Sequence, residues 1–417
     1  MHLFYLIVSL LVILPDLYIR LVCLRGISLG WWNLLYWAPL AFFLFLVVMY
    51  FAGGSQPFVF KSMVASILCF TVPKLLFTIM SILCLGAVYA AGCFGAQETV
   101  RSALTGVFNA IGIGLAGSFL ILALYGLTAG VKRLDVREEV FESDSLPASF
   151  DGYRIVHLSD LHASSYSAPG MVERLVTTVN DLDADMIAFT GDLVNSSPSE
   201  LDERMMSALS SLRAHDGVFA VVGNHDYCEY HEYDTPDGAA RAFAEVVRCE
   251  RAMGWRVLMD SSAVITRPSV SAPDKKQDSI YVIGVEHCGK PPFGSRGDLQ
   301  KALSGVPPVF FYSDADSVRS SSPFKILLSH DSSHWRMEVL PHTDIQLTLS
   351  GHTHAMQFRI GRFSPSRWMY REWYGVYREG ARMLNVSAGL GGSFPFRIGA
   401  WPEIVVITLH TLSGQGN

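Results

Sequence analysis

Residues 217–226 read Gly217-Val-Phe-Ala-Val-Val-Gly-Asn-His-Asp226, an apolar run that ends abruptly in a polar cluster. A near-continuous apolar run of this length is typical of a buried strand. Patterns typical of helices separate the early strands, over residues 170–182 and 198–212, so the sequence predicts an α/β fold that opens with a βαβαβ unit. Four other stretches have the same form, namely Arg154–Asp160, Asp185–Asp192, Lys325–Asp331 and Asp344–His354.

Metal-binding residue types gather at the ends of these five strands. In open α/β sheets, ligand sites assemble at the edge where the strands end. Carboxylate, amide and imidazole groups together suit Mn²⁺, Fe²⁺ or Zn²⁺ better than Ca²⁺. The ligands are too many for one tetrahedral ion, whereas two ions roughly 3.5–4 Å apart can share a carboxylate and a hydroxide for in-line displacement at phosphorus. The residues in question are Asp160, His162, Asp192, Asn224, His225, His330, His352 and His354.

The spacing of these residues resembles the five-block signature of the calcineurin-like metallophosphoesterase superfamily. The blocks are Asp160-Leu-His162, Gly191-Asp192, Gly223-Asn224-His225-Asp226, His330 and Gly351-His352-Thr-His354. The flanking sequence, with Leu327-Leu-Ser-His-Asp and Pro402-Glu403-Ile, is similar to the branch whose members carry N-terminal transmembrane helices. The resemblance implies a β-sandwich flanked by helices, with four layers in the order α/β/β/α, over residues 153–417.

The resemblance also implies a role for each residue of the site. Asp160, His162 and His354 would bind the first ion, and Asn224, His330 and His352 would bind the second. Asp192 would bridge the two ions, for which Mn²⁺ is favoured over Fe²⁺ and Zn²⁺. His225 would contact the phosphate and help to protonate the leaving oxygen, a role that suits a side chain able to titrate near neutral pH.

One position departs from the family pattern. Asn195 stands where many relatives have an Asp that orients the catalytic histidine and adds charge beside it. A neutral amide stabilises an imidazolium less well than a carboxylate does. Asp226 is one candidate to compensate, and the alternative is that His225 acts mainly as a hydrogen-bond donor to the phosphate.

The first 130 residues form a membrane domain by composition. The whole chain of 417 residues is 50% hydrophobic and 17% charged, with a mean hydropathy of +0.30, which is too apolar for an ordinary soluble protein. Apolar runs over residues 3–22, 34–51, 64–90 and 107–129 are each near the ~20 residues that a spanning helix needs, so we expect about four transmembrane helices. Residues 131–152 are polar and are expected to form a linker.

Charge and cysteine patterns limit the location and the partners. An even number of spans places both ends on one side, where Lys61, Lys74, Lys132, Arg133 and Arg137 outnumber the opposite set. This bias favours a cytoplasmic catalytic domain on the plasma membrane of a prokaryote. The part after residue 130 is acidic, which argues against binding of a nucleic-acid polymer. The seven cysteines suggest no disulfide framework.

Several other polar residues have open interpretations. His157 lies within an apolar run and is expected to be a core histidine, whereas His334 and His342 are expected at the surface. For His287, a position away from the site is favoured over one at its rim. The basic, aromatic segment of residues 367–374 either binds a lipid headgroup or packs as a lid, and Asp16 is expected near a membrane interface.

Together these features predict a membrane-anchored, metal-dependent phosphohydrolase, most simply a phosphodiesterase that uses two metal ions and a bridging hydroxide. A lipid-linked phosphoester is the expected substrate class, because the catalytic domain is tethered to a membrane. One alternative is a pyrophosphatase acting on a nucleotide-sugar lipid. The other is a receptor or transporter whose soluble domain binds metal without turnover.

Overall fold

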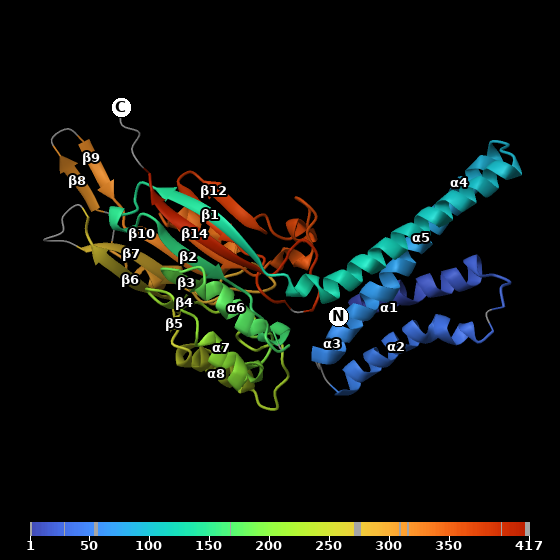
Figure 1. Cartoon of the computed structure of the whole chain (residues 1–417), viewed down its shortest axis with the longest axis horizontal. Coiled ribbons are helices and arrows are strands. Elements are labelled where there is room, and N and C mark those ends of the chain that lie inside the picture. Colours follow the sequence, from blue (N-terminus) through green and yellow to red (C-terminus); the bar gives the residue numbers. More distant parts are fainter. Residues whose placement is uncertain are drawn as a thin grey trace. The chain divides into compact units, whose positions relative to one another are not determined.

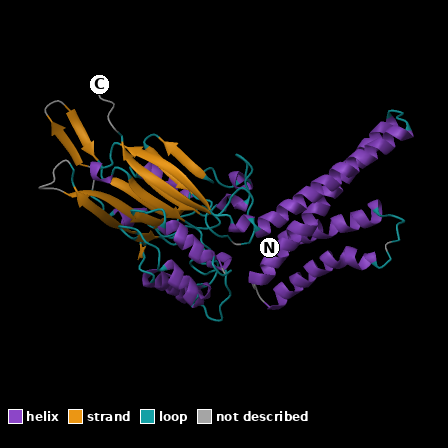
Figure 2. Ribbon diagram, in the orientation of Figure 1, coloured by secondary structure: helices purple, strands orange, loops and turns teal. Residues whose placement is uncertain are grey.

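The computed structural model describes residues 2–28, 30–53, 57–166, 168–270, 277–307, 310–314, 317–392 and 394–412. The chain divides into two compact units. The first comprises Met1–Gly130 with Phe394–Phe396, and the second comprises Val131–Ser393 with Arg397–Asn417. The first unit is helical and the second contains both sheets and helices (Figures 1 and 2).

The membrane unit consists of α1 (His2–Tyr18), α2 (Trp32–Gly53), α3 (Pro57–Ser66), α4 (Val72–Cys93) and α5 (Glu98–Thr128). A π-helical turn, Ile67–Thr71, joins α3 to α4, so that the two form one continuous stretch. Three described segments are long and apolar enough to cross a membrane: Trp32–Ala52, Phe58–Cys93 and Glu98–Lys132. They match the second, third and fourth predicted runs, whereas a span over residues 3–22 stays a prediction.

Asp16 of α1 is buried, with 3% of its surface exposed. Its carboxylate lies 2.5 Å from the Lys74 ammonium of α4. The Tyr36 hydroxyl of α2 donates a hydrogen bond to the Asp16 backbone carbonyl at 2.6 Å. Asp16 therefore belongs to an ion pair that joins two helices, since an unpaired carboxylate in an apolar bundle is costly. Its expected position near a membrane interface stays a prediction.

The second unit is built around two six-stranded mixed sheets. Sheet A has the strand order β1-β14-β2-β3-β4-β5, and sheet B has the order β12-β13-β11-β10-β7-β6. The strands of sheet A are β1 (Asp135–Ser143), β2 (Tyr153–Leu158), β3 (Met186–Phe189), β4 (Val218–Ala220), β5 (Arg256–Val257) and β14 (Glu403–Thr411). Those of sheet B are β6 (Ser261–Pro268), β7 (Gln277–Gly284), β10 (Phe324–Asp331), β11 (Leu347–Gly351), β12 (Gly375–Glu379) and β13 (Arg382–Val386), and β8 (Phe310–Asp314) pairs separately with β9 (Ser317–Ser321).

Apolar side chains pack the two sheets face to face. One buried cluster contains Phe219 and Ile155 of sheet A together with Ile326 and Leu349 of sheet B. A second cluster covers the outer face of sheet A with the helices α6 (Met171–Asn180), α7 (Glu203–Leu209) and α8 (Gly238–Ala252), as Figure 1 shows. A third covers sheet B with α9 (Leu299–Leu303) and the π-helical turn Trp335–Val339 before α10 (Leu340–His342). The predicted four-layer α/β/β/α architecture is confirmed.

The segment that the sequence assigns to a linker contains a strand. β1 runs parallel to the C-terminal strand β14, with Asp135 opposite Glu403. Its side chains alternate between more and less buried positions, which is the pattern of a strand at the edge of a sheet. Its polar composition concealed this pattern, because the outward positions carry charged residues.

Candidate metal centre

All but one of the proposed ligands lie on tight loops that follow β2, β3, β4 and β11, and His330 lies near the end of β10 itself. Five of these residues have backbone φ angles in the left-handed region: Asp160 (53°), His162 (45°), Asp192 (58°), His352 (68°) and His354 (48°). A left-handed backbone costs a non-glycine residue of the order of 1–2 kcal/mol. Such strained residues cluster at functional sites, where the surrounding fold holds them. The loops are therefore shaped to turn these side chains toward one another.

The first cluster contains Asp160, His162, Asp192 and His354, each with one ligand atom within 4.8 Å of the others. His354 Nε2 lies 3.2 Å from Asp160 Oδ1 and 3.2 Å from His162 Nε2. His162 Nε2 lies 3.6 Å from Asp192 Oδ2. Nitrogen and oxygen lone pairs therefore converge on one point.

The second cluster contains Asp192, His330 and His352. His330 Nε2 lies 3.2 Å from Asp192 Oδ2, the same oxygen that belongs to the first cluster, and 3.2 Å from His352 Nδ1. His330 Nδ1 donates a hydrogen bond to the Thr190 carbonyl at 2.7 Å, which orients the Nε2 atom toward the cluster. The two clusters thus share the Asp192 carboxylate.

Asn224 follows Gly223 at the end of β4 and is buried. Its amide nitrogen donates to the Tyr230 hydroxyl at 3.0 Å, and its oxygen has no partner among the described residues. A buried carbonyl oxygen without a hydrogen bond is costly unless something else binds it. This orphaned oxygen and the convergent lone pairs fit a pair of divalent cations.

The His225 ring is oriented by the backbone of Asn195 and not by its side chain. His225 Nδ1 lies 2.5 Å from the Asn195 carbonyl, and the ring packs 4.8 Å from that of His162. The backbone N–H of His225 donates to Asp192 Oδ1 at 2.8 Å. A neutral backbone carbonyl therefore contacts the His225 ring, and no hydrogen bond to Nε2 is formed by the residues that the structure describes.

The Asp226 side chain binds backbone N–H groups of the neighbouring loops. Its carboxylate accepts hydrogen bonds from the N–H groups of Asp192, Leu193, Val194 and Gly223, at 2.8 to 3.2 Å. Burial and the neighbouring Asp192 charge raise the pKa of Asp226 to about 7. These hydrogen bonds hold the Asp192 loop rather than the His225 ring.

Burial keeps most imidazoles of the metal-free site neutral. It lowers the pKa of His162 and of His354 to about 3, and that of His352 well below its ordinary value. For His330, burial acts in the same direction, but the Asp192 carboxylate overrides it and raises the pKa to about 10. Neutral imidazoles present the lone pairs that metal ions need.

Three further residues reach the second cluster. The Tyr370 hydroxyl lies 2.9 Å from His352 Nε2, and Asp331 Oδ2 lies 3.6 Å from the same nitrogen. The buried His287 ring lies 5.6 Å from the His330 ring, and neither of its nitrogens has a partner among the described residues. Tyr370 belongs to the basic, aromatic segment, but nothing in its spacing pointed to His352.

Arg397 also contacts a proposed ligand, which its place in the glycine-rich segment of residues 389–399 did not predict. It is 1% exposed, and its Nη2 atom lies 3.4 Å from His354 Nδ1.

Among the histidines with open interpretations, His157 is a core residue that forms hydrogen bonds with Thr190 and Asn385. The surface position expected for His334 is wrong: it is 1% exposed and contacts Ser329, because the helical turn that follows β10 folds back over sheet B.

Comparison with known proteins identifies the class. Residues 153–356 match the family model "Calcineurin-like phosphoesterase". A zebrafish (Danio rerio) "Transmembrane protein with metallophosphoesterase domain" is 28% identical over 295 residues, which cover 69% of this chain and 60% of the relative. The "Uncharacterized metallophosphoesterase YkuE" of Bacillus subtilis is 28% identical over 71% of this chain and 96% of the relative. The "UDP-2,3-diacylglucosamine pyrophosphatase LpxG" of Chlamydia muridarum is 24% identical over 62% of this chain and 84% of the relative.

Solved structures with distant similarity include a Thermus thermophilus 5'-nucleotidase precursor, at 13% identity with a TM-score of 0.35, which covers 61% of this chain and 54% of that one. Residues 153–356 therefore form a calcineurin-like phosphoesterase domain, and the similar zebrafish protein is named as a transmembrane protein with a domain of this kind. This family depends on a dinuclear metal centre, and the two clusters that share Asp192 supply candidate residues for one.

Proposed function

We propose that the chain is a membrane-anchored phosphodiesterase that works with two divalent metal ions, Mn²⁺ being favoured. The observation that carries this proposal is Asp192 Oδ2, which lies 3.2 Å from His330 Nε2 and 3.6 Å from His162 Nε2, between the two clusters. Asp160, His162 and His354 hold the first ion, and Asn224, His330 and His352 hold the second. Asp192 bridges them.

The protein's own residues position the substrate and the proton. When bound, the two ions supply charge for the transition state and an activated hydroxide for attack on phosphorus. His225 carries a proton on Nε2 and donates it to the leaving oxygen. The Asn195 carbonyl, 2.5 Å from Nδ1, fixes the ring so that Nε2 faces the substrate. The backbone bonds of Asp226 hold the loop that carries Asp192.

Metal-dependent turnover of the full-length protein tests this function. With Mn²⁺ added, we expect hydrolysis of an aryl phosphodiester to exceed hydrolysis of the matching monoester. Asp192→Asn should lower the rate at least about 100-fold, because the shared ligand is lost. Asp298→Asn serves as a control, because Asp298 is an exposed residue at the start of α9 and asparagine caps a helix as well as aspartate does. Full activity of a folded Asp192→Asn protein would refute the mechanism.

A second candidate is hydrolysis of the diphosphate in a nucleotide-linked lipid. Two Chlamydia relatives carry the name of a UDP-2,3-diacylglucosamine pyrophosphatase. In this chain, a cavity of about 680 Å³ reaches from Tyr370, beside His352, to several arginine and aromatic side chains. Cations and aromatic faces suit a nucleotide and its phosphates. The side chains include Arg359, Arg362, Arg367, Arg371, Trp373 and Tyr374.

Product analysis separates the two candidates. A pyrophosphatase releases a nucleoside monophosphate from a nucleotide-diphosphate lipid, whereas a simple diesterase releases an alcohol. The exposed pair Arg367→Gln/Arg371→Gln should raise KM for the nucleotide lipid about tenfold and leave KM for the aryl diester unchanged. An equal effect on both substrates would exclude the cavity as a nucleotide subsite.

The cytoplasmic side of a prokaryotic plasma membrane is the proposed place of the catalytic unit. Limited proteolysis tests this orientation. The catalytic unit should be cut in inverted membrane vesicles and protected in intact spheroplasts. Protection in the inverted vesicles would place it on the opposite side.

A further inference from the structure

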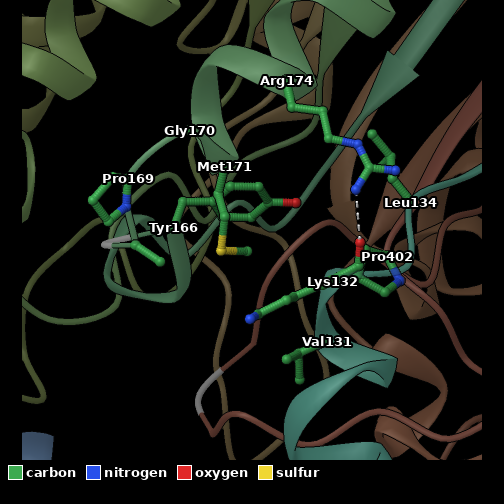
Figure 3. A pocket seen from close by; sticks show the side chains of 10 residues that line it. Val131, Lys132, Leu134, Tyr166, Pro169, Gly170, Met171, Arg174 and Pro402 are labelled. Atoms are coloured by element: carbon green, nitrogen blue, oxygen red, sulfur yellow. Dashed lines mark hydrogen bonds between the residues drawn. The ribbon is translucent and has the colours of Figure 1, made fainter.

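A small cavity with two cationic side chains lies on the second unit. It has a volume of about 240 Å³, and none of its ten lining residues is acidic. Figure 3 shows the Lys132 side chain extending into it and the Arg174 side chain crossing it from α6. The remaining walls are largely apolar and include Val131, Leu134 and Met171. Two positive charges beside apolar walls suit an amphiphilic anion.

The walls of this cavity are held in place. Arg174 Nη1 donates to the Lys132 carbonyl at 3.4 Å. The Tyr166 hydroxyl donates to the Leu390 carbonyl at 3.2 Å, and Arg204 donates to the Tyr166 carbonyl at 2.8 Å. The Lys132 ammonium has no hydrogen bond or ion pair to any residue that the structure describes, and it is exposed. One fixed and one unpaired cation therefore face a pre-formed cavity.

This cavity is connected along the chain to a candidate membrane span. The third candidate membrane span ends at Lys132. A lysine at the end of a span reaches for the headgroup layer, where lipid phosphates are concentrated. The cavity is thus lined by the residue at which the chain leaves this candidate span.

Within the second unit, this entry point of the chain also lies at the metal-bearing edge. Asp135 N–H donates to the Pro402 carbonyl at 2.8 Å, and the neighbouring Glu403 N–H donates to Gly389 at 3.2 Å. Two residues further on, the Gly391 N–H donates to the Asp160 carbonyl at 2.7 Å. Three backbone hydrogen bonds therefore connect the start of β1 with the first ligand of the site.

We infer that the Lys132–Arg174 cavity binds the phosphate headgroup of an anionic membrane lipid, beside the metal-bearing edge. Its volume is below the 300–1,000 Å³ common for whole-ligand pockets, so it accommodates a headgroup while the acyl chains stay in the bilayer. Lys132 and Arg174 pair with the phosphate, and Met171 and Val131 contact the glycerol carbons. This inference concerns binding and does not depend on hydrolysis.

Native mass spectrometry of the full-length protein in mild detergent tests the site. The protein is titrated with phosphatidylglycerol, with phosphatidylcholine, and with inorganic phosphate as a competitor. Lys132→Gln/Arg174→Gln should lose one bound phosphatidylglycerol, with about a tenfold or larger loss of affinity. The control pair Arg241→Gln/Arg248→Gln removes two exposed charges from α8 and should bind as the unaltered protein does.

Four results would overturn the inference: undiminished phosphatidylglycerol binding by the Lys132 and Arg174 pair, an equal loss in the control, equal binding of phosphatidylcholine, or complete displacement by inorganic phosphate. The last would identify a free-anion site. Lys132→Glu, a charge reversal at an exposed position, should abolish binding without unfolding the protein. Because no step involves turnover, failure here leaves the proposed phosphodiesterase function standing.

Discussion

Asp160 is held by a directed chain of buried hydrogen bonds. The Asn385 amide donates to His157 Nδ1 at 2.9 Å, and His157 Nε2 donates to the Thr190 hydroxyl at 2.9 Å. Thr190 donates to Ser159 at 2.7 Å, and Ser159 donates to Asp160 Oδ2 at 2.5 Å. Each donor fixes the next group, so the carboxylate is oriented before any metal arrives.

Thr190→Val breaks this chain at its middle. We expect metal affinity to fall about 10- to 100-fold, as is usual when a partner of a ligand is removed. Thr348→Val is the matched control, because Thr348 is 1% exposed and its hydroxyl has no partner among the described residues. Isothermal titration with Mn²⁺ measures both variants. Equal affinities for the two would show that the chain does not support the site.

Metal binding should release a proton from His330. Its pKa of about 10 means that the ring is protonated at neutral pH in the metal-free protein, whereas a metal ligand must be neutral. Affinity should therefore rise about tenfold per pH unit from neutral pH up to a pH of about 10. Calorimetry in buffers of different ionisation enthalpy should find about one proton released per chain at pH 7. A buffer-independent heat would contradict this prediction.

At this scale, sequence reasoning located the proposed ligands because each follows an apolar strand in a recognisable block. It did not locate Tyr370, which contacts His352 across 18 residues through loop geometry, or Arg397, which stands in a glycine-rich turn. It offered Asp226 as one candidate to compensate for Asn195, with His225 as a hydrogen-bond donor to the phosphate as the alternative, whereas a backbone carbonyl contacts His225. A backbone carbonyl is present at every residue, so the sequence does not show which carbonyl contacts the His225 ring.

Among the elements, α1 and α4 are joined by the Asp16–Lys74 pair. Lys74→Met should destabilise the membrane unit by roughly 3–5 kcal/mol, because it leaves a buried carboxylate unpaired. Asp16→Asn/Lys74→Met should recover most of this loss, since it removes both charges. Thermal unfolding in detergent, read from the helical circular-dichroism signal, compares the two proteins. Equal melting temperatures of the single and double variants would show that Asp16 and Lys74 do not stabilise each other.

Elements were predictable where they were apolar and periodic. The strands that carry the ligands, and the helices α6 and α7, follow from hydrophobic runs and their spacing. β1 was hidden because five of its nine residues are acidic or basic, and an edge strand buries only alternate side chains. α8 was missed because the polar residues 229–237 before it gave no clear starting signal.

For the whole molecule, the four-layer architecture follows from the family resemblance. The order of the strands within each sheet does not. Sheet A places the last strand, β14, between β1 and β2. Local periodicity says nothing about which distant strands pair, because pairing depends on the closure of long loops. The orientation of β14, parallel to β1 and antiparallel to β2, appears only in the three-dimensional structure.

The central position of β14 has a consequence for synthesis. Arg137 of β1 and Glu403 of β14 bond to each other although they are 266 residues apart. At a ribosomal rate of about 5–20 residues per second, β1 emerges roughly 10–50 s before its partner exists. During that interval β1 and β2 are both synthesised, but the strand that pairs with each of them is missing. The hydrogen-bonding edge of β2 that faces β14 is therefore unpaired. Completion of sheet A therefore waits for the synthesis of β14.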